Sequence, residues 1–217
     1  MIENTYLRSR ARYQLGSSIW SNDWLLMLAI CAIWSILSSF MPNIRIVQID
    51  EETALRLNPL FFLEGVFMYG ICRAAIKLAR GQKIEFMDTF AGFKENFSGA
   101  LILGLLQTVF IFLWMLLLIV PGIVKSYSYA MAYYLRQDDP SKDKQAIDYI
   151  NQSKAMMEGY KWKLFCLDLS FIGWYIVGAL CLGIGLFFVV PYHEVARANF
   201  YEELKLSSGM VNPPEGM

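Results

Sequence analysis

Long apolar stretches alternate with short polar segments along this chain. Residues 24–41 carry no charged side chain, and Lys125 is the single charge within residues 98–135. A third charge-poor stretch covers residues 164–204. A membrane-spanning helix needs roughly 20 mostly apolar residues, so the first stretch suits one span and each of the others suits a hairpin of two. The pattern therefore predicts several membrane spans.

The two hairpin stretches repeat one another. Pro121 and Pro191 each follow two branched apolar residues. A similar aromatic and basic segment precedes each hairpin, GFKENF at 92–97 and GYKWKLF at 159–165. Each copy thus has the order surface helix, span, turn and returning span, which indicates an internal repeat.

The turn inside each hairpin has two candidate positions. Pro121-Gly122 is a local turn signal in the first hairpin. The second hairpin instead has a glycine-rich segment at residues 183–185, which aligns with residues 113–115. The aligned position is favoured because it leaves each returning helix about 20 residues, enough to cross a bilayer. Pro121 and Pro191 are then helix kinks early in the returning helices.

Three amphipathic segments precede the predicted hairpins. Leu7, Ala11 and Leu15 recur every four residues with arginines on the other faces, the pattern of a basic helix lying on a membrane. Phenylalanines recur with a helical period over residues 86–97, and residues 138–163 are polar and then amphipathic. We therefore expect three interfacial helices.

The predicted fold class is all-α: a polytopic membrane protein of about six transmembrane helices in hairpins, with cytoplasmic amphipathic interfacial helices. Residues 1–206 form a single membrane domain, and residues 207–217 form a disordered tail. The units of the domain, each an interfacial helix with a hairpin, span about 1–80, 81–137 and 138–206. With both termini in the cytoplasm, every lysine and arginine except Arg45 and Arg56 falls on the cytoplasmic side, as the positive-inside rule requires.

The composition supports a membrane protein and narrows the function classes. Hydrophobic residues make up 56% and charged residues 18%, whereas a soluble domain is about a quarter charged. The net charge of +0 gives no bulk attraction to nucleic acid. The four cysteines have no metal-site spacing, so we expect no metal and no cofactor. The single histidine, and the lack of a G-x-S-x-G motif or paired intramembrane aspartates, argue against the common hydrolytic enzymes.

Charged side chains inside the predicted spans are the candidates for a polar site. A charge at the centre of a bilayer costs about 2.5–3.5 kcal/mol, so each one needs a role. Asp168 should face the bundle interior and pair with Lys125, Arg73 or Arg197. It is either a proton- or ion-coupling carboxylate or one half of a structural ion pair, and the structural interpretation is favoured.

A second cluster follows Pro191. His193 and Arg197 are four residues apart, and Glu194 and Arg197 are three apart, so all three can share one helix face. Polar groups beyond a broken helix line sites in transporters, yet the same cluster is ordinary at a membrane interface, and both interpretations stay open. The tyrosines within residues 127–134 are interpreted as an interfacial aromatic belt.

Four segments carry a resemblance to a known family. They are the F-x-x-x-F-x-x-F run, LLLIVPGI at 116–123, SKAMMEGYKWKLFCLDLSFIGW at 153–174 and PYHEVARANFYEEL at 191–204. These segments resemble an uncharacterised family of bacterial integral membrane proteins catalogued as domain of unknown function 975. The resemblance covers nearly the whole chain and is weakest over residues 42–58. It implies a Gram-positive cytoplasmic-membrane protein with several spans, and it implies no activity and no catalytic residue.

The expected function is therefore broad. We expect a non-enzymatic, multi-pass protein of the bacterial cytoplasmic membrane that binds or moves a small or lipidic substrate. The alternative is a non-catalytic scaffold or accessory subunit of a membrane complex. The expected partners are the lipid bilayer, a small-molecule or lipid ligand and, in the alternative, another membrane protein, with no nucleic acid.

Overall fold

The computed structural model describes residues 3–16, 21–40, 44–48, 54–57, 63–95, 97–141, 144–180 and 185–208. Over these residues the fold is helical, as predicted, apart from one small sheet. In that sheet β1 (Ile44–Gln48) pairs antiparallel with β2 (Ala54–Leu57). The apolar pattern predicts only a polar loop here, so this small sheet is an addition to the predicted helical fold. Its isoleucines and valine are residues that favour strands.

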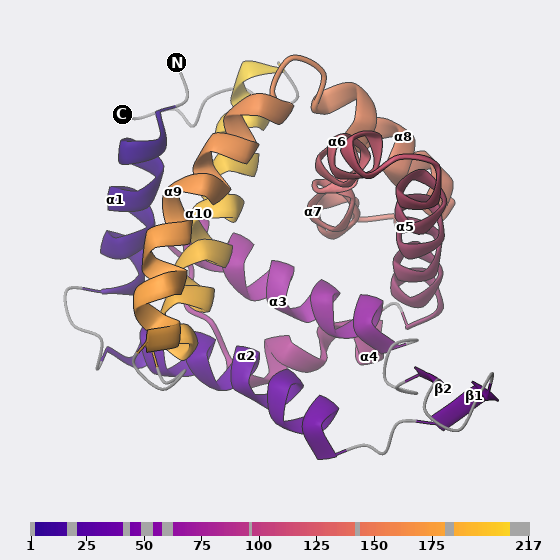
Figure 1. Cartoon of the computed structure of the whole chain (residues 1–217). Helices are drawn as coiled ribbons and strands as arrows, with labels where there is room; N and C mark the ends of the chain where they lie inside the picture. Colours follow the sequence, from indigo (N-terminus) through magenta and orange to yellow (C-terminus); the bar gives the residue numbers. More distant parts are fainter. Residues whose placement is uncertain are drawn as a thin grey trace.

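Two helices form the centre of the fold, α3 (Glu64–Ala79) and α10 (Leu186–Ser207). The helices packed around α10 are α1 (Asn4–Leu15), α2 (Asn22–Phe40) and α9 (Lys161–Leu180). The elements packed around α3 also include the 3₁₀ helix η2 (Phe86–Phe90), α4 (Ala91–Glu95), α5 (Phe97–Leu117) and α7 (Ala132–Asp138). The remaining helices, α6 (Ile119–Tyr129) and α8 (Ala146–Met156), pack with α5. In Figure 1, α1, α9 and α10 lie on one side of the molecule and α5 to α8 on the other, with α3 between them.

The apolar face predicted for the N-terminal helix is present. Leu7, Ala11 and Leu15 are fully buried on one face of α1. The protein itself covers this face, because α1 packs against α10, α9 and α3. Gln14 Nε2 donates a hydrogen bond to the Ala79 carbonyl oxygen at 2.9 Å, which ties α1 to the end of α3. The sequence alone suggested that this face lies on lipid. In the structure the face is covered by the protein and is not free to do so.

The first hairpin turns at one residue. α5 ends at Leu117 and α6 begins at Ile119, while Leu118 between them has an extended backbone with φ −161° and ψ 136°. Both predicted turn positions are therefore wrong. The segment at residues 113–115 is too early, and Pro121-Gly122 is too late. Pro121 falls in the first turn of α6, where a missing backbone N–H costs nothing, so it is not a kink within a helix. A Cβ on Gly122 would lie 2.5 Å from Met115 Cγ and 3.0 Å from its Cα, so this glycine lets α6 start against α5.

The second hairpin joins α9 to α10. α9 ends at Leu180 and α10 begins at Leu186, and the predicted turn glycine at position 183 lies outside the described residues. The two helices approach each other closely, because a Cβ on Gly185 would lie 2.6 Å from the Cα of Gly178. Pro191 lies inside α10, where it removes one backbone hydrogen bond from the helix. α10 continues to Ser207, so of the predicted C-terminal tail only residues 209–217 lie outside the description.

The predicted second interfacial helix is divided into η2 and α4. Asp88 of η2 is buried and accepts hydrogen bonds from Lys77 Nζ at 2.7 Å and from Arg73 Nε at 3.2 Å. A Cβ on Gly92 would lie 2.3 Å from the Val66 carbonyl oxygen, so α4 also touches the backbone of α3. These contacts attach the segment to α3 and break the continuous helix that its phenylalanine period suggests.

Ion pairs join the ends of α3, α7 and α10. Arg80 Nη2 lies 2.6 Å from an Asp138 carboxylate oxygen and 2.8 Å from Glu202 Oε1. Asp138 also accepts hydrogen bonds from Lys205 Nζ and from the Tyr201 hydroxyl. Burial alone raises the pKa of Asp138, but the hydrogen bonds from Lys205 and Arg80 outweigh burial and hold this pKa below its ordinary value.

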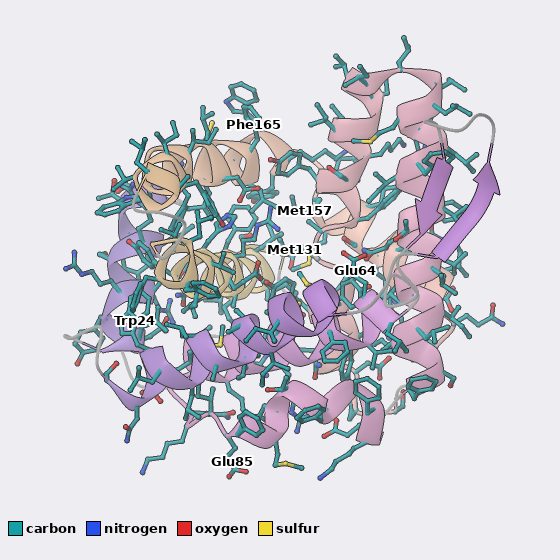
Figure 2. The ribbon with its side chains drawn as sticks, turned by 60° about the horizontal axis from the view of Figure 1, so that its bottom comes forward. Trp24, Glu64, Glu85, Met131, Met157 and Phe165 are labelled. Carbon is teal, nitrogen blue, oxygen red and sulfur yellow. The ribbon has the colours of Figure 1, made fainter. Side chains whose placement is uncertain are left out.

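Two of the described helices, α5 and α9, are long and apolar enough to cross a membrane. In each helix, only 22% of an apolar stretch of 18 residues is buried inside the protein. The core helix of a soluble protein is mostly buried. The five residues from Leu116 to Val120, at the α5–α6 turn, each expose at least 62% of their surface. Figure 2 shows this hairpin standing out from the body, while Met131 and Met157 lie in the interior. Apolar surface of this extent marks a membrane or protein contact.

Candidate polar site between α9 and α10

Asp168 of α9 meets His193 and Arg197 of α10. Arg197 donates two hydrogen bonds to the Asp168 carboxylate, from Nε to Oδ1 at 3.0 Å and from Nη2 to Oδ2. His193 Nε2 lies 2.7 Å from Asp168 Oδ1. The i, i+4 spacing puts His193 and Arg197 on one face of α10, and the antiparallel hairpin turns that face toward α9. Of the three partners predicted for Asp168, the structure brings Arg197 to it.

Tyr175 completes a chain of hydrogen bonds through the histidine. Its hydroxyl lies 2.9 Å from His193 Nδ1, and it stands seven residues after Asp168 on the same side of α9. An ionised carboxylate only accepts, so Nε2 carries the proton that is shared with Asp168. Nδ1 of a neutral imidazole then accepts from the Tyr175 hydroxyl. Neutral His193 therefore satisfies both neighbours, and the ring of Phe171 packs 4.7 Å from it.

Glu194 differs from the other members of the predicted cluster. Its Oε2 is buried and has no hydrogen-bond partner within the part of the chain that the structure describes. It is within electrostatic range of Arg197 and of the buried Cys72. Glu194 therefore adds a second carboxylate that acts electrostatically on the Arg197 guanidinium.

A cavity of about 220 Å³ adjoins Arg197. Its polar lining also includes Gln107 of α5, Tyr127 of α6 and Tyr133 of α7. Gln107 is held by a hydrogen bond from Nε2 to the Tyr129 carbonyl oxygen at 2.6 Å. The cavity therefore lies where α3, α5, α6 and α10 meet, with a polar wall among apolar helices.

The tyrosines near this cavity are not an interfacial belt. Tyr129, Tyr133 and Tyr134 are buried, with Tyr134 only 2% exposed, and Tyr127 is half-buried. They lie inside because α6 and α7 turn them toward α5, α3 and α10. The belt interpretation is therefore wrong.

Two predicted site residues lie elsewhere. Arg73 pairs with Asp88 and with Glu95, 2.5 Å from its Nη1, on the side of α3 that faces η2. Lys125 lies over the Trp114 ring, 4.6 Å from its centroid, within the first hairpin. Both are therefore separate from Asp168.

Two members of the site were missed from the sequence. The seven-residue spacing of Tyr175 from Asp168 was a usable signal, since it puts both side chains on one helix face. Gln107 was a second signal, because a lone amide in an apolar helix often bonds across to a neighbouring helix.

The fold and this site define a class: a helical-hairpin protein with two membrane-length helices and an ionic cluster between packed helices. The chain belongs to the family described as "Protein of unknown function (DUF975)", which it matches over residues 1–128 and again over residues 115–208. This match confirms the resemblance found in the sequence. No curated protein and no solved structure matches the chain.

Proposed function

We propose that this chain is a multi-pass protein of the bacterial cytoplasmic membrane that binds, and helps move, a small or lipidic substrate. Residues 1–206 form one membrane domain in this proposal, with six spans and both termini in the cytoplasm. The exposed apolar surfaces of α5 and α9 support insertion, since lipid covers such surface without a polar partner. The near-absence of lysine and arginine from the predicted outer side supports the orientation.

The observation that carries the substrate proposal is the cavity of about 220 Å³ beside the Asp168–Arg197 pair. Binding sites for small molecules are concave and combine apolar side chains with a few convergent polar groups. This cavity has both kinds of lining, with Met68 and Ile111 among its apolar side chains. Arg197, Gln107 and Tyr127 supply the polar groups.

The scaffold alternative also has an observation in its favour. The Asp168 carboxylate accepts hydrogen bonds from Arg197 and His193 on the neighbouring helix. A carboxylate used in this way fixes the packing of α9 on α10 without any ligand. In that case the protein acts through another membrane protein that contacts its exposed hairpins.

Native mass spectrometry of the protein released gently from its own membrane tests the proposal. We expect a reproducible small molecule or lipid on the wild type that is lost in Arg197→Met and Asp168→Asn. Lys125→Gln is the matched control, because it removes a charge from the first hairpin outside the cavity. A stoichiometric protein partner with no small molecule would overturn the substrate proposal and favour the scaffold.

A further inference from the structure

A second, larger cavity lies away from the Asp168 cluster. It measures about 410 Å³ and is formed by the start of α5, by α7 and by the start of α8. Its polar lining includes Arg136 and Lys144, and its apolar lining includes Ile102 and Leu106. The substrate proposal uses none of these residues.

Arg136 is the unusual group in this cavity. It is only 3% exposed, and its Nε and Nη1 atoms are buried without a hydrogen-bond partner among the residues that are described. Its guanidinium packs 5.0 Å from the ring centroid of Tyr149. A guanidinium stays charged and has five N–H donors, so burying it with donors unused is costly. An anion in the cavity would remove this cost.

The start of α8 contributes further positive potential. The side chains of Gln145 and Asp148 form a capping box, which satisfies the backbone amides of those two residues. Ala146 and Ile147, in the same first turn, line the cavity, and their backbone amides have no acceptor within the helix. A helix N-terminus of this kind favours a phosphate or carboxylate group.

Lys144 stands at the same edge of the cavity. Its Nζ lies 3.2 Å from Asp139 Oδ2, and Asp139 also accepts hydrogen bonds from Ser141 and Tyr149. The hydrogen bond from Ser141 is the largest of the effects that lower the pKa of Asp139 below its ordinary value. Asp139 therefore stays ionised and holds Lys144 beside the cavity.

The apolar side of the cavity continues along α5. Ile102, Leu106 and Val109 follow the helical period on one face of this helix, and Ile102 and Val109 are about half exposed. The cavity thus has a cationic part, formed by Arg136 and Lys144, and an apolar part that continues along the membrane-length helix α5. A free phosphate would contact only the cationic part, whereas an anionic phospholipid would contact the cationic part with its headgroup and the apolar part with its acyl chains.

We propose that Arg136, Lys144 and the first turn of α8 bind a phosphate group, presented as the headgroup of an anionic phospholipid. The Arg136 guanidinium donates to two phosphate oxygens, and the amides of Ala146 and Ile147 donate to the others. The acyl chain lies along Ile102, Leu106 and Val109 of α5. The phosphate site is independent of the substrate cavity, and only its lipid source rests on the proposed membrane location.

Three probes separate the parts of this proposal on the full-length, delipidated protein in neutral detergent. Dioctanoyl phosphatidic acid carries phosphate and chains, dioctanoylglycerol carries only chains, and inorganic phosphate carries only the anion. We expect phosphatidic acid to bind tightest and to raise the melting temperature. Arg136→Gln should weaken its binding about 10- to 100-fold, because hydrogen bonds to a charged group are lost.

The variants also separate this site from general effects. Without ligand, Arg136→Gln should melt no lower than the wild type, because it removes a buried charge of which Nε and Nη1 have no hydrogen-bond partner among the described residues. Lys154→Gln, which removes an exposed charge from α8, is the matched control and should bind like the wild type. Asp168→Asn should also bind phosphatidic acid normally, whatever happens to the substrate proposal.

Three results would overturn the proposal or its lipid source. Equal binding of dioctanoylglycerol and phosphatidic acid would mean that the cavity does not recognise phosphate, and so would unchanged binding by Arg136→Gln. Inorganic phosphate binding as tightly as phosphatidic acid would overturn the lipid source and assign the cavity to a free phosphate.

Discussion

Replacing both members of the Asp168–Arg197 pair should cost much less stability than replacing either one. The two side chains are only 15% and 26% exposed, and two hydrogen bonds join them. Asp168→Leu leaves the guanidinium buried and unpaired, and Arg197→Met leaves the carboxylate in the same position. Removing one partner of a buried pair costs about 3–5 kcal/mol, whereas apolar replacement of both is nearly neutral. The coupling energy between the two sites should then approach the sum of the two single losses, about 6–10 kcal/mol.

The assay is reversible unfolding in mixed micelles, with the wild type, the two single variants and the double variant measured under one condition. His193 keeps its hydrogen bond to Tyr175 in the double variant, so it adds little to the difference. The pairing would be refuted if the loss of unfolding free energy in the double variant equalled the sum of the two single losses to within about 0.5 kcal/mol. The double variant also separates the two proposed functions: a folded protein without its small molecule favours the substrate cavity, and a fully functional one favours a structural pair.

Two further predictions rest on contacts elsewhere in the fold. Gly104→Ala should destabilise the protein by about 1–3 kcal/mol in the same unfolding assay, because a Cβ there would lie 2.6 Å from the Cα of Gly65. Gly173→Ala is its control, since a Cβ there meets nothing within 4 Å, and it should be neutral or stabilising; equal losses in both variants would contradict the close approach of α3 to α5. The lowered pKa of Asp138 means that its ionised form stabilises the fold above its ordinary pKa and that this contribution is lost as the pH falls below about 4. Asp138→Asn should flatten the dependence of the unfolding midpoint on pH in that range, and an unchanged slope would show that the contact with Lys205 does not matter.

The local patterns that the sequence predicted correctly are those in which one helix face decides the outcome. The four-residue period of Leu7, Ala11 and Leu15 predicted the buried side of α1, and the spacing of His193 and Arg197 predicted that they share a face. Both predictions need only the helical repeat. What covers a face is a tertiary property, and this is why α1 was placed on lipid although it packs against the protein.

The turn of the first hairpin was missed for a different reason. Proline and glycine are compatible both with a turn and with the first turn of a helix, so Pro121-Gly122 did not distinguish the two. The turn residue itself, Leu118, has no local turn signal. Its position is set by the contact of Gly122 with Met115 across the hairpin.

The burial of Arg136 is the feature of the fold that the sequence pattern predicts least well. In the sequence it ends a charge-poor stretch, the ordinary position of a basic residue at a membrane surface. In the fold it is buried, because α8 returns along α7 and covers it with Tyr149. No local sequence pattern predicts this burial, because it depends on how the short helices α7 and α8 pack against each other.

The six-span arrangement with cytoplasmic termini is the central claim, and labelling of single cysteines in intact cells tests it most directly. Gln48→Cys and Ser141→Cys would each be made in a variant without the four native cysteines and treated with a membrane-impermeant maleimide. The account predicts labelling of Gln48→Cys from outside and of Ser141→Cys only after the membrane is permeabilised. Labelling of Ser141→Cys from outside intact cells would contradict it.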